Sequence, residues 1–299
     1  MVVGLVGCGR WGRNILRDLQ ELGCDVPVVA RSAESKARAS GGGASAIVPD
    51  IASLPSLDGV VVATTTSTHA SVLEGALALG VPVFVEKPLS NDPEAAARLA
   101  RDAGDRLFVM DKWRYHPGVL EIAAIVRERR LGAVSGIRTV RVGWDTPHDD
   151  VDPVWILAPH DLAIGLEVMG AVPRPVAATA HWVHGDAMHL SGVLEGDGWW
   201  HVVEVSGRSP ERRRRVELYC TDGVAVLGGG WDDHVSIFSS VNGELREERV
   251  ATRGELPLKA ELRAFVEHLG GGRPPRSSAA EAAAIVAAIA ELRRLAGES

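Results

Sequence analysis

The sequence predicts two domains of different fold class. Residues 1–112 are expected to form an α/β domain around a doubly wound parallel sheet, and residues 113–299 a domain built mainly on an antiparallel sheet. A strand, a glycine-rich turn and a helix open the chain, and strands then alternate with helices as far as residue 110, which is typical of a parallel sheet. Beyond that point, short segments alternate apolar and polar residues, which indicates strands with one packed face.

The first element is an apolar run over residues 2–6 that leads into a G-x-G-x-x-G motif formed by Gly7, Gly9 and Gly12. Residues 13–22 follow with an apolar stripe at helical spacing. In this context the motif predicts a dinucleotide site of the Rossmann type, because Gly7 permits a tight turn and Gly9 lets the backbone approach a pyrophosphate. Gly12 lets the helix pack close to the strand, and the helix N-terminus points its amide groups at the phosphates.

The second strand, residues 26–30, ends at Arg31 and Ser32, where a Rossmann domain meets the adenosine ribose. An acidic residue at that point binds the ribose 2′-hydroxyl, whereas an arginine suits a 2′-phosphate. Arg31 and Ser32 therefore favour NADP as the cofactor, with NAD as the alternative.

Polar segments follow two later strands of the same domain. Residues 64–69 come after one buried apolar run, and the triplet Glu86-Lys87-Pro88 comes after another. Because the carboxyl ends of parallel strands share one edge of the sheet, both segments and the glycine turn are expected to border one ligand crevice. Lys87 is placed there to hydrogen-bond a substrate oxygen near a nicotinamide. Besides the three glycines, Arg31 and Ser32, the expected cofactor contacts are Arg10, Trp11, Thr64, Thr65, His69, Glu86 and Lys87.

The second domain is expected to hold a helix over residues 119–130, an antiparallel sheet and a last helix over residues 279–296. Four tryptophans make this sheet unusually aromatic. An aromatic sheet face is typical of a subunit interface, and burial beneath helices explains the tryptophans equally well. The tryptophans are Trp182, Trp199, Trp200 and Trp231, and the strands are predicted at residues 176–184, 188–194, 199–205, 216–220, 224–227 and 235–238.

Composition and charge argue against several classes of protein. The net charge of −7 disfavours non-specific binding of nucleic acid, and the arginine run at residues 212–215 is predicted to lie along a solvated strand edge. The sequence shows neither a signal peptide nor an apolar stretch of membrane-spanning length. Cys8, Cys24 and Cys220 lack the spacing of metal ligands, so reduced thiols, a cytoplasmic protein and no metal site are expected.

Residues 6–14, residues 63–69 and the Glu86-Lys87-Pro88 triplet together resemble the glucose-fructose oxidoreductase / inositol dehydrogenase / rhizopine catabolism (Gfo/Idh/MocA) family, and the likeness extends over essentially the whole chain. The resemblance implies a Rossmann domain, an open-faced antiparallel sheet domain with helices on one side, and a bound nicotinamide cofactor. It also implies assembly as a homo-oligomer, a dimer or tetramer, through the open face. In the family the lysine of the triplet is catalytic, which carries over to Lys87, and the Lys–Pro peptide is often cis.

The second family element is a helix with an aspartate and a histidine one turn apart. It matches residues 152–162, where His160 aligns with the catalytic histidine and suits acid–base work because its pKa lies near neutrality. Ile156 stands where the family often has the aspartate. Three alternatives follow: Lys87 and His160 suffice, Asp161 compensates, or the chemistry has drifted.

These features predict an NADP-preferring oxidoreductase that moves a hydride between nicotinamide and a hydroxyl or carbonyl carbon of a small molecule. A sugar, a nucleotide sugar or a cyclitol is the substrate that the resemblance implies. The alternatives are an imine or enamine reductase in a biosynthetic pathway and a non-catalytic scaffold that keeps the cofactor site, which Ile156 supports. The candidate substrate contacts are Arg114, Tyr115, Trp144, Asp145 and Asp161.

Overall fold

The computed structural model describes residues 1–144 and 150–298, which form two compact units. The first unit comprises residues 1–112 and 256–286, and the second comprises residues 113–255 and 287 onward. The chain thus leaves the first unit at residue 112. It returns to the first unit at residue 256, although the sequence analysis assigned everything after residue 112 to the second domain.

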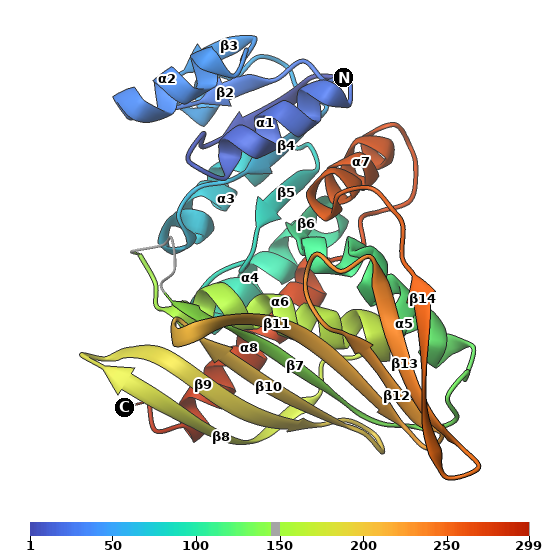
Figure 1. The fold of residues 1–299 in the computed structure, drawn as a ribbon. Helices are drawn as coiled ribbons and strands as arrows, with labels where there is room; N and C mark the ends of the chain where they lie inside the picture. Colours follow the sequence, from blue (N-terminus) through green and yellow to red (C-terminus); the bar gives the residue numbers. More distant parts are fainter. Residues whose placement is uncertain (145–149, 299) are drawn as a thin grey trace. The chain divides into compact units, whose positions relative to one another are not determined.

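The first unit is built on a six-stranded parallel sheet with strand order β3-β2-β1-β4-β5-β6 (Figure 1). This order confirms the doubly wound parallel sheet. The helices α2 and α7 were not predicted, because α2 lacks an apolar stripe and α7 follows the second sheet in the sequence. The elements are β1 (Val3–Val6), α1 (Gly12–Glu21), β2 (Pro27–Val29), α2 (Ala33–Gly41), β3 (Ala46–Val48), η1 (Ile51–Ser53), β4 (Gly59–Val62), η2 (Thr66–Thr68), α3 (His69–Leu77), β5 (Val83–Glu86), α4 (Pro93–Ala103), η3 (Gly104–Arg106), β6 (Leu107–Met110), α7 (Pro257–Leu269) and the start of α8 (Ala279–Leu295).

Local signals explain where these elements begin and how they pack. The strands β1 and β4 are buried along their whole length, which fits their continuous apolar sequence. Asp92 caps α4 by accepting hydrogen bonds from the amides of Glu94 and Ala95, with Pro93 in the first turn. The fully buried ring of Phe265 on α7 stacks on that of Phe84 on β5 with 5.0 Å between centroids. Aromatic stacking thus fixes α7 to the parallel sheet.

The second unit is built on an eight-stranded sheet with strand order β14-β13-β12-β11-β7-β10-β9-β8. Its neighbours are antiparallel except for β7 and β10, which are parallel, so the mainly antiparallel domain is confirmed. No helix in the described part of either unit is long and apolar enough to cross a bilayer. The elements are η4 (Lys112–Tyr115), α5 (Pro117–Arg127), β7 (Val134–Trp144), α6 (Pro153–Met169), β8 (Arg174–Val183), β9 (Asp186–Glu195), β10 (Trp200–Ser206), β11 (Arg208–Cys220), β12 (Gly223–Leu227), β13 (His234–Val241), β14 (Glu244–Ala251) and the end of α8.

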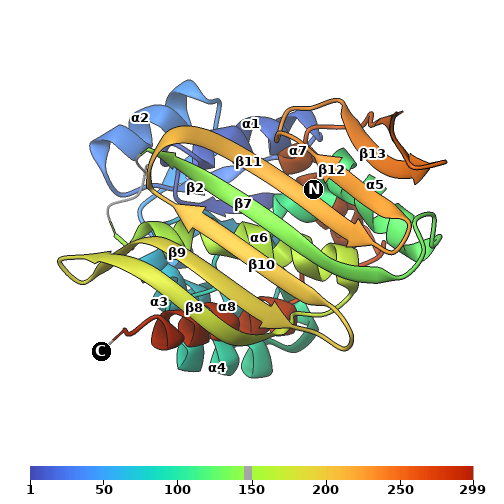
Figure 2. The ribbon, with the colours of Figure 1, turned by 60° about the horizontal axis from the view of Figure 1, so that its bottom comes forward.

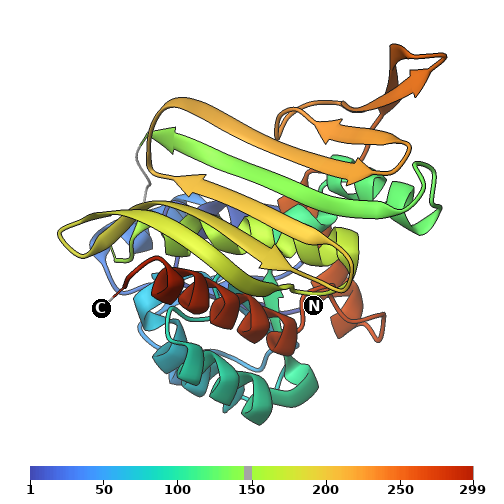
Figure 3. The same cartoon turned by 90° about the horizontal axis from the view of Figure 1, so that it is seen from below.

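Helices α5, α6 and the end of α8 lie on one face of this sheet (Figures 2 and 3). Ile137 of β7 and Leu218 of β11 belong to one buried cluster with Ile164 of α6, so their strand positions define the helix-facing side. His201 of β10 lies on that side too, and burial lowers its pKa to about 3, so it is a neutral core residue at physiological pH.

The tryptophans of the sheet do not share one face. Trp182 lies on the helix side, where its indole N–H donates to the Ala296 carbonyl over 3.1 Å. Trp200 points to the opposite side from its neighbour His201, and its ring covers Gly136 beside Tyr219. Contact with a helix therefore accounts for Trp182, and Trp200 lies on the face away from the helices.

Candidate cofactor and active-site residues

The glycine turn between β1 and α1 is closed by backbone contacts that leave no room for side chains at two of its three glycines. Gly7 has a φ of +94°, and a Cβ on Gly12 would lie 2.3 Å from the Gly7 carbonyl oxygen. A Cβ on Gly9, by contrast, would meet nothing within 4 Å. Gly7 and Gly12 thus shape the turn, and Gly9 leaves space beside the backbone in front of α1. This geometry fits the pyrophosphate of a dinucleotide at the helix N-terminus.

At the end of β2, the predicted ribose site carries Arg31 and Ser32. The Arg31 side chain is exposed, and the Ser32 hydroxyl caps α2 by accepting a hydrogen bond from the Ser35 amide over 3.1 Å. Glu34 follows in the first turn of α2 and pairs with Arg38. The predicted ribose position therefore carries an exposed cationic side chain rather than a carboxylate.

The triplet at the end of β5 is connected to the glycine turn by Glu86. One oxygen of this carboxylate accepts a hydrogen bond from the indole N–H of Trp11, and the other accepts one from the Lys87 amide over 3.1 Å. The Lys87–Pro88 peptide is cis, as the resemblance implied. Glu86 therefore ties the segment that carries Lys87 to the turn that begins α1.

His69, predicted as a cofactor contact, joins two loops at the same edge of the sheet. It is 1% exposed, its Nδ1 donates to the Pro88 carbonyl oxygen over 2.8 Å, and its Nε2 lies 3.3 Å from the Thr64 carbonyl oxygen. The Thr68 hydroxyl donates to the Thr65 carbonyl over 2.8 Å, which closes the short turn after β4. His69 thus holds the backbone of Pro88, next to Lys87.

Glu261 of α7 is a buried carboxyl that the sequence analysis missed. It is fully buried, and neither oxygen makes a hydrogen bond to any residue that the structure describes. Burial raises the pKa of Glu261 well above its usual range, and the negative charges of Glu86 and Asp111 add to this effect while Lys112 opposes it. The Lys112 ammonium in turn lies 4.1 Å from the centroid of the Trp11 ring. A glutamate on an apolar helical stripe was the available signal.

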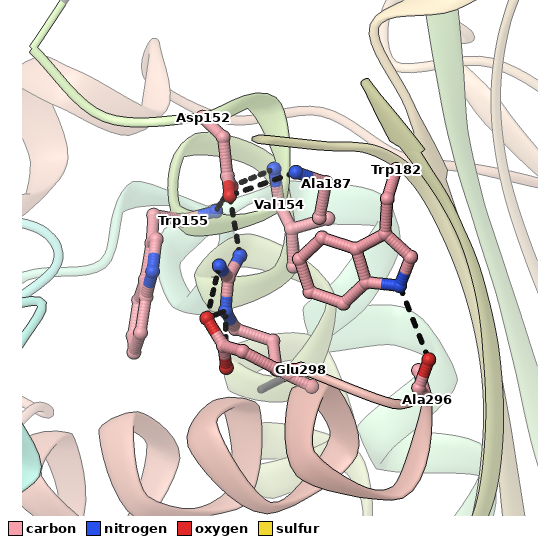
Figure 4. A network of polar contacts seen from close by, with 8 residues as sticks. Asp152, Val154, Trp155, Trp182, Ala187, Ala296 and Glu298 are labelled. Atoms are coloured by element: carbon pink, nitrogen blue, oxygen red, sulfur yellow. Dashed lines mark hydrogen bonds and ion pairs between the residues drawn. The ribbon is translucent and has the colours of Figure 1, made fainter. Parts of the chain in front are cut away.

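In the second unit, α6 carries the predicted acid–base residue. Asp152 begins the helix by accepting hydrogen bonds from the amides of Val154 and Trp155 at 3.1 and 3.3 Å. Its second oxygen accepts from the Ala187 amide over 3.0 Å and from Arg293 over 2.5 Å (Figure 4). The N-terminus of α6 is thus fixed to β9 and to the end of α8.

Arg293 is the centre of this network. Its guanidinium is 5% exposed, binds Glu298 through two nitrogens, and lies 5.5 and 5.2 Å from the ring centroids of Trp155 and Trp182. The side chain therefore has an ionic partner on each side and aromatic faces around it.

The predicted residues of α6 fall into different environments. His160 is half-buried, and Ile156, one turn earlier, is 5% exposed. Asp161 is buried and forms an ion pair with Arg141 of β7. Asp161 thus faces the sheet, where its carboxylate is already engaged by an arginine.

The other candidate substrate contacts are dispersed within the second unit. Arg114 forms a buried ion pair with Glu167 of α6 at 2.9 Å. Trp144, at the end of β7, is 64% exposed, and Tyr115 is half-buried in η4. Asp145 lies outside the residues that the structure describes.

Residues 1–110 match the family described as "Oxidoreductase family, NAD-binding Rossmann fold", which is Gfo/Idh/MocA. The match covers the glycine turn, the strands of the parallel sheet and the Glu86-Lys87-Pro88 triplet. The resemblance that the glycine turn and the Glu86-Lys87-Pro88 triplet predicted is thereby confirmed, and so is a nucleotide-binding domain of an oxidoreductase.

Relatives and solved structures extend the likeness beyond this domain. The UDP-N-acetylglucosamine 3-dehydrogenase of Acidithiobacillus ferrooxidans is 26% identical over 306 residues, which cover 98% of this chain and 96% of that enzyme. Inositol 2-dehydrogenase 2 of Saccharopolyspora erythraea is 29% identical over 194 residues, 60% of this chain and 57% of that one. The structure of levoglucosan dehydrogenase in complex with NADH and levoglucosan has a TM-score of 0.89 at 16% identity and covers 100% of this chain and 98% of that one. At that identity the structural match shows a shared fold across both units.

Replacing Glu261 by glutamine should stabilise the protein increasingly as the pH rises. Because its pKa is raised, Glu261 of the folded protein keeps its proton at pH values at which the unfolded chain, with a pKa of about 4.3 for this group, has released it. The wild type therefore loses stability as the pH rises. Glutamine has no such proton to lose. Urea unfolding should show the advantage of Glu261→Gln growing as the pH rises above the unfolded-state pKa of about 4.3. A difference that is constant with pH, or equal to that of Glu267→Gln at an exposed position of α7, would contradict this.

Replacing Arg293 by methionine should destabilise the second unit by about 3 kcal/mol, because it leaves the buried Asp152 carboxylate without its cation. Arg294, the next residue, pairs with Glu291 on the surface and provides the matched control. Arg294→Met should cost less than about 1 kcal/mol, since exposed ion pairs contribute little. Urea titrations measure the free energy of unfolding of both variants. Equal losses would show that the buried ion pair contributes no more to stability than the exposed one.

Proposed function

We propose that this protein is an oxidoreductase that transfers a hydride between a nicotinamide cofactor, preferably NADP, and a hydroxyl-bearing carbon of a sugar, nucleotide sugar or cyclitol. The observation that carries the proposal is the connection of the Lys87 segment to the glycine turn through Glu86 and Trp11. The backbone of Lys87 is thereby held at the carboxyl edge of the sheet that, in this family, binds the nucleotide.

The names of the relatives support the substrate class. They act, by their names, on UDP-N-acetylglucosamine, on inositol and on levoglucosan, which share a ring carbon that bears a hydroxyl. A polyhydroxylated ring, free or carried by a nucleotide, is the common substrate class, and UDP-N-acetylglucosamine and myo-inositol are the first compounds to test.

The proposed chemistry assigns one role to each of two side chains. When bound, the nicotinamide cofactor accepts or returns the hydride. Lys87 donates a hydrogen bond to the substrate oxygen and stabilises the negative charge that develops on it. His160 takes the hydroxyl proton on oxidation and returns it on reduction, for which an imidazole is suited near neutral pH. Neither residue needs a carboxylate at position 156 for these steps.

The buried Ile156 favours a second candidate function. In the family this position often carries an aspartate, and an apolar residue here removes a carboxylate one turn from His160. Reduction of an imine or enamine needs less of such a pair, and a non-catalytic scaffold needs none of it.

Arg31 should select NADPH over NADH. Its exposed guanidinium can pair with a 2′-phosphate, so Arg31→Asp should weaken NADPH binding by about 10- to 100-fold and change NADH binding much less. Titrations that follow nicotinamide fluorescence measure both affinities, with Arg101→Asp at an exposed position of α4 as the control for charge. Equal affinity of the wild type for the two nucleotides would remove the NADP preference, and failure to bind either below millimolar would end the enzyme proposal.

Lys87→Ala and His160→Ala should each lower kcat by about 10²- to 10⁴-fold, the usual contribution of a general acid–base or charge-stabilising group. His160→Ala should bind the cofactor nearly as the wild type does. Steady-state rates with UDP-N-acetylglucosamine, myo-inositol and a cyclic imine distinguish the candidates. The reductase would be favoured if only the imine is turned over and if this turnover survives in His160→Ala but not in Lys87→Ala. Absence of turnover with all three substrates would favour the scaffold.

A further inference from the structure

The arginine run at residues 212–215 is split between the two faces of the second sheet. The run lies in the first half of β11, where the strand pairs with β7 only, because its pairing with β12 begins at Val216. Arg212 and Arg213 are exposed there, which fits the predicted solvated strand edge, whereas Arg214 and Arg215 are half-buried. Arg215 binds Glu217 over 2.6 Å on the face away from the helices. Arg214 shares the opposite face with Val216, which packs in the helix-side cluster. Only alternate arginines of the run therefore face α6.

Two further observations place Arg212 and Arg214 beside the buried ion pair of α6. Arg214 is directly opposite Arg141 in the pairing of β11 with β7. A Cβ on Gly143, two residues after Arg141, would lie 3.7 Å from the Arg212 side chain. Three arginines thus line neighbouring positions on the helix-facing side of β7 and β11, and Asp161, which interacts with Arg214, is already bound by Arg141.

Positive charge at this place is not fully compensated within the described residues. The Arg214 Nε is buried and makes no hydrogen bond to any of them. Burial, together with the charges of Arg141 and Arg212, lowers the pKa of Arg214 to about 10, although Asp161 opposes this. A buried donor of a charged group is costly unless an acceptor satisfies it, and a guanidinium presents paired donors that match phosphate and carboxylate oxygens.

We propose that Arg212 and Arg214 bind an anionic group of the substrate, either a phosphate or a carboxylate. The inference rests on the proposed function. Asp161, which lies beside these arginines, directly follows His160, the proposed acid–base residue, in the chain. It narrows the substrate class from polyhydroxylated rings in general to rings that carry an acid or a diphosphate. Arg212 is exposed and Arg214 half-buried, so an incoming anion can reach both side chains.

The test compares binding of three ligands to the full-length protein by calorimetry with cofactor present. UDP-N-acetylglucosamine carries phosphates, glucuronate carries a carboxylate, and myo-inositol is neutral. Arg214→Gln should weaken binding of the anionic ligand by about 10- to 100-fold, the range for a hydrogen bond to a charged group, and leave myo-inositol unchanged. Arg213→Gln, at the exposed neighbour on the other face, is the matched control and should change neither.

A loss with UDP-N-acetylglucosamine alone assigns the site to phosphate, and a loss with glucuronate alone assigns it to carboxylate. If Arg214→Gln fails to fold, as its melting temperature would show, Arg212→Gln provides the same comparison from an exposed position. The proposal is overturned if neither anion binds the wild type below millimolar, or if Arg213→Gln weakens binding as much as Arg214→Gln. Hydride transfer to an anionic ring that Arg214→Gln leaves intact would overturn the anion site alone. Binding that depends on Arg214 without any turnover would overturn the proposed function alone.

Discussion

The second unit depends on buried arginines that meet the carboxylates of one apolar helix. Helix α6 is buried on most of its surface, yet it begins at Asp152 and carries Asp161 and Glu167. Each carboxylate is met by an arginine from another element: Arg293 of α8, Arg141 of β7 and Arg114 of η4. Apolar packing alone would let such a helix slide or rotate, whereas a charged hydrogen bond inside a protein has a defined distance and direction. These pairs therefore fix the register of α6 and the position of His160 along it.

In the first unit, close backbone contacts and hydrogen bonds between neighbouring loops fix the local structure around Lys87. The Gly7 and Gly12 backbones approach too closely for side chains, and the Trp11 indole that follows this turn binds Glu86. His69 then holds the Pro88 carbonyl from the neighbouring loop. Lys87 is thus placed by residues from three separate loops at one edge of the sheet. Such support from neighbouring segments is what keeps a reactive group in a fixed geometry.

Charge is also the feature that links the proposals. The first unit buries Glu261 near Glu86, and burial raises the pKa of both carboxyls, with the charge of Glu86 adding to the effect on Glu261. The second unit has the opposite imbalance at Arg214, beside Arg141 and Asp161. Uncompensated buried charge is usually eliminated from a core because it costs stability, so its presence beside candidate site residues is informative about function.

The sequence by itself determined the two sheets, the glycine turn, the Lys87 segment and the helix of His160, because strand periodicity, glycine spacing and helix caps are local signals. It did not determine that α7 belongs to the first unit or that Glu261 is buried near Glu86. Only the tertiary structure showed that Asp161 is engaged by Arg141, and that Asp152 is bound by Arg293, 141 residues away. Which charged residues form such pairs depends on which faces of the helices and strands pack together. The sequence alone does not distinguish a charged residue that contacts solvent from one that binds an ionic partner or a ligand.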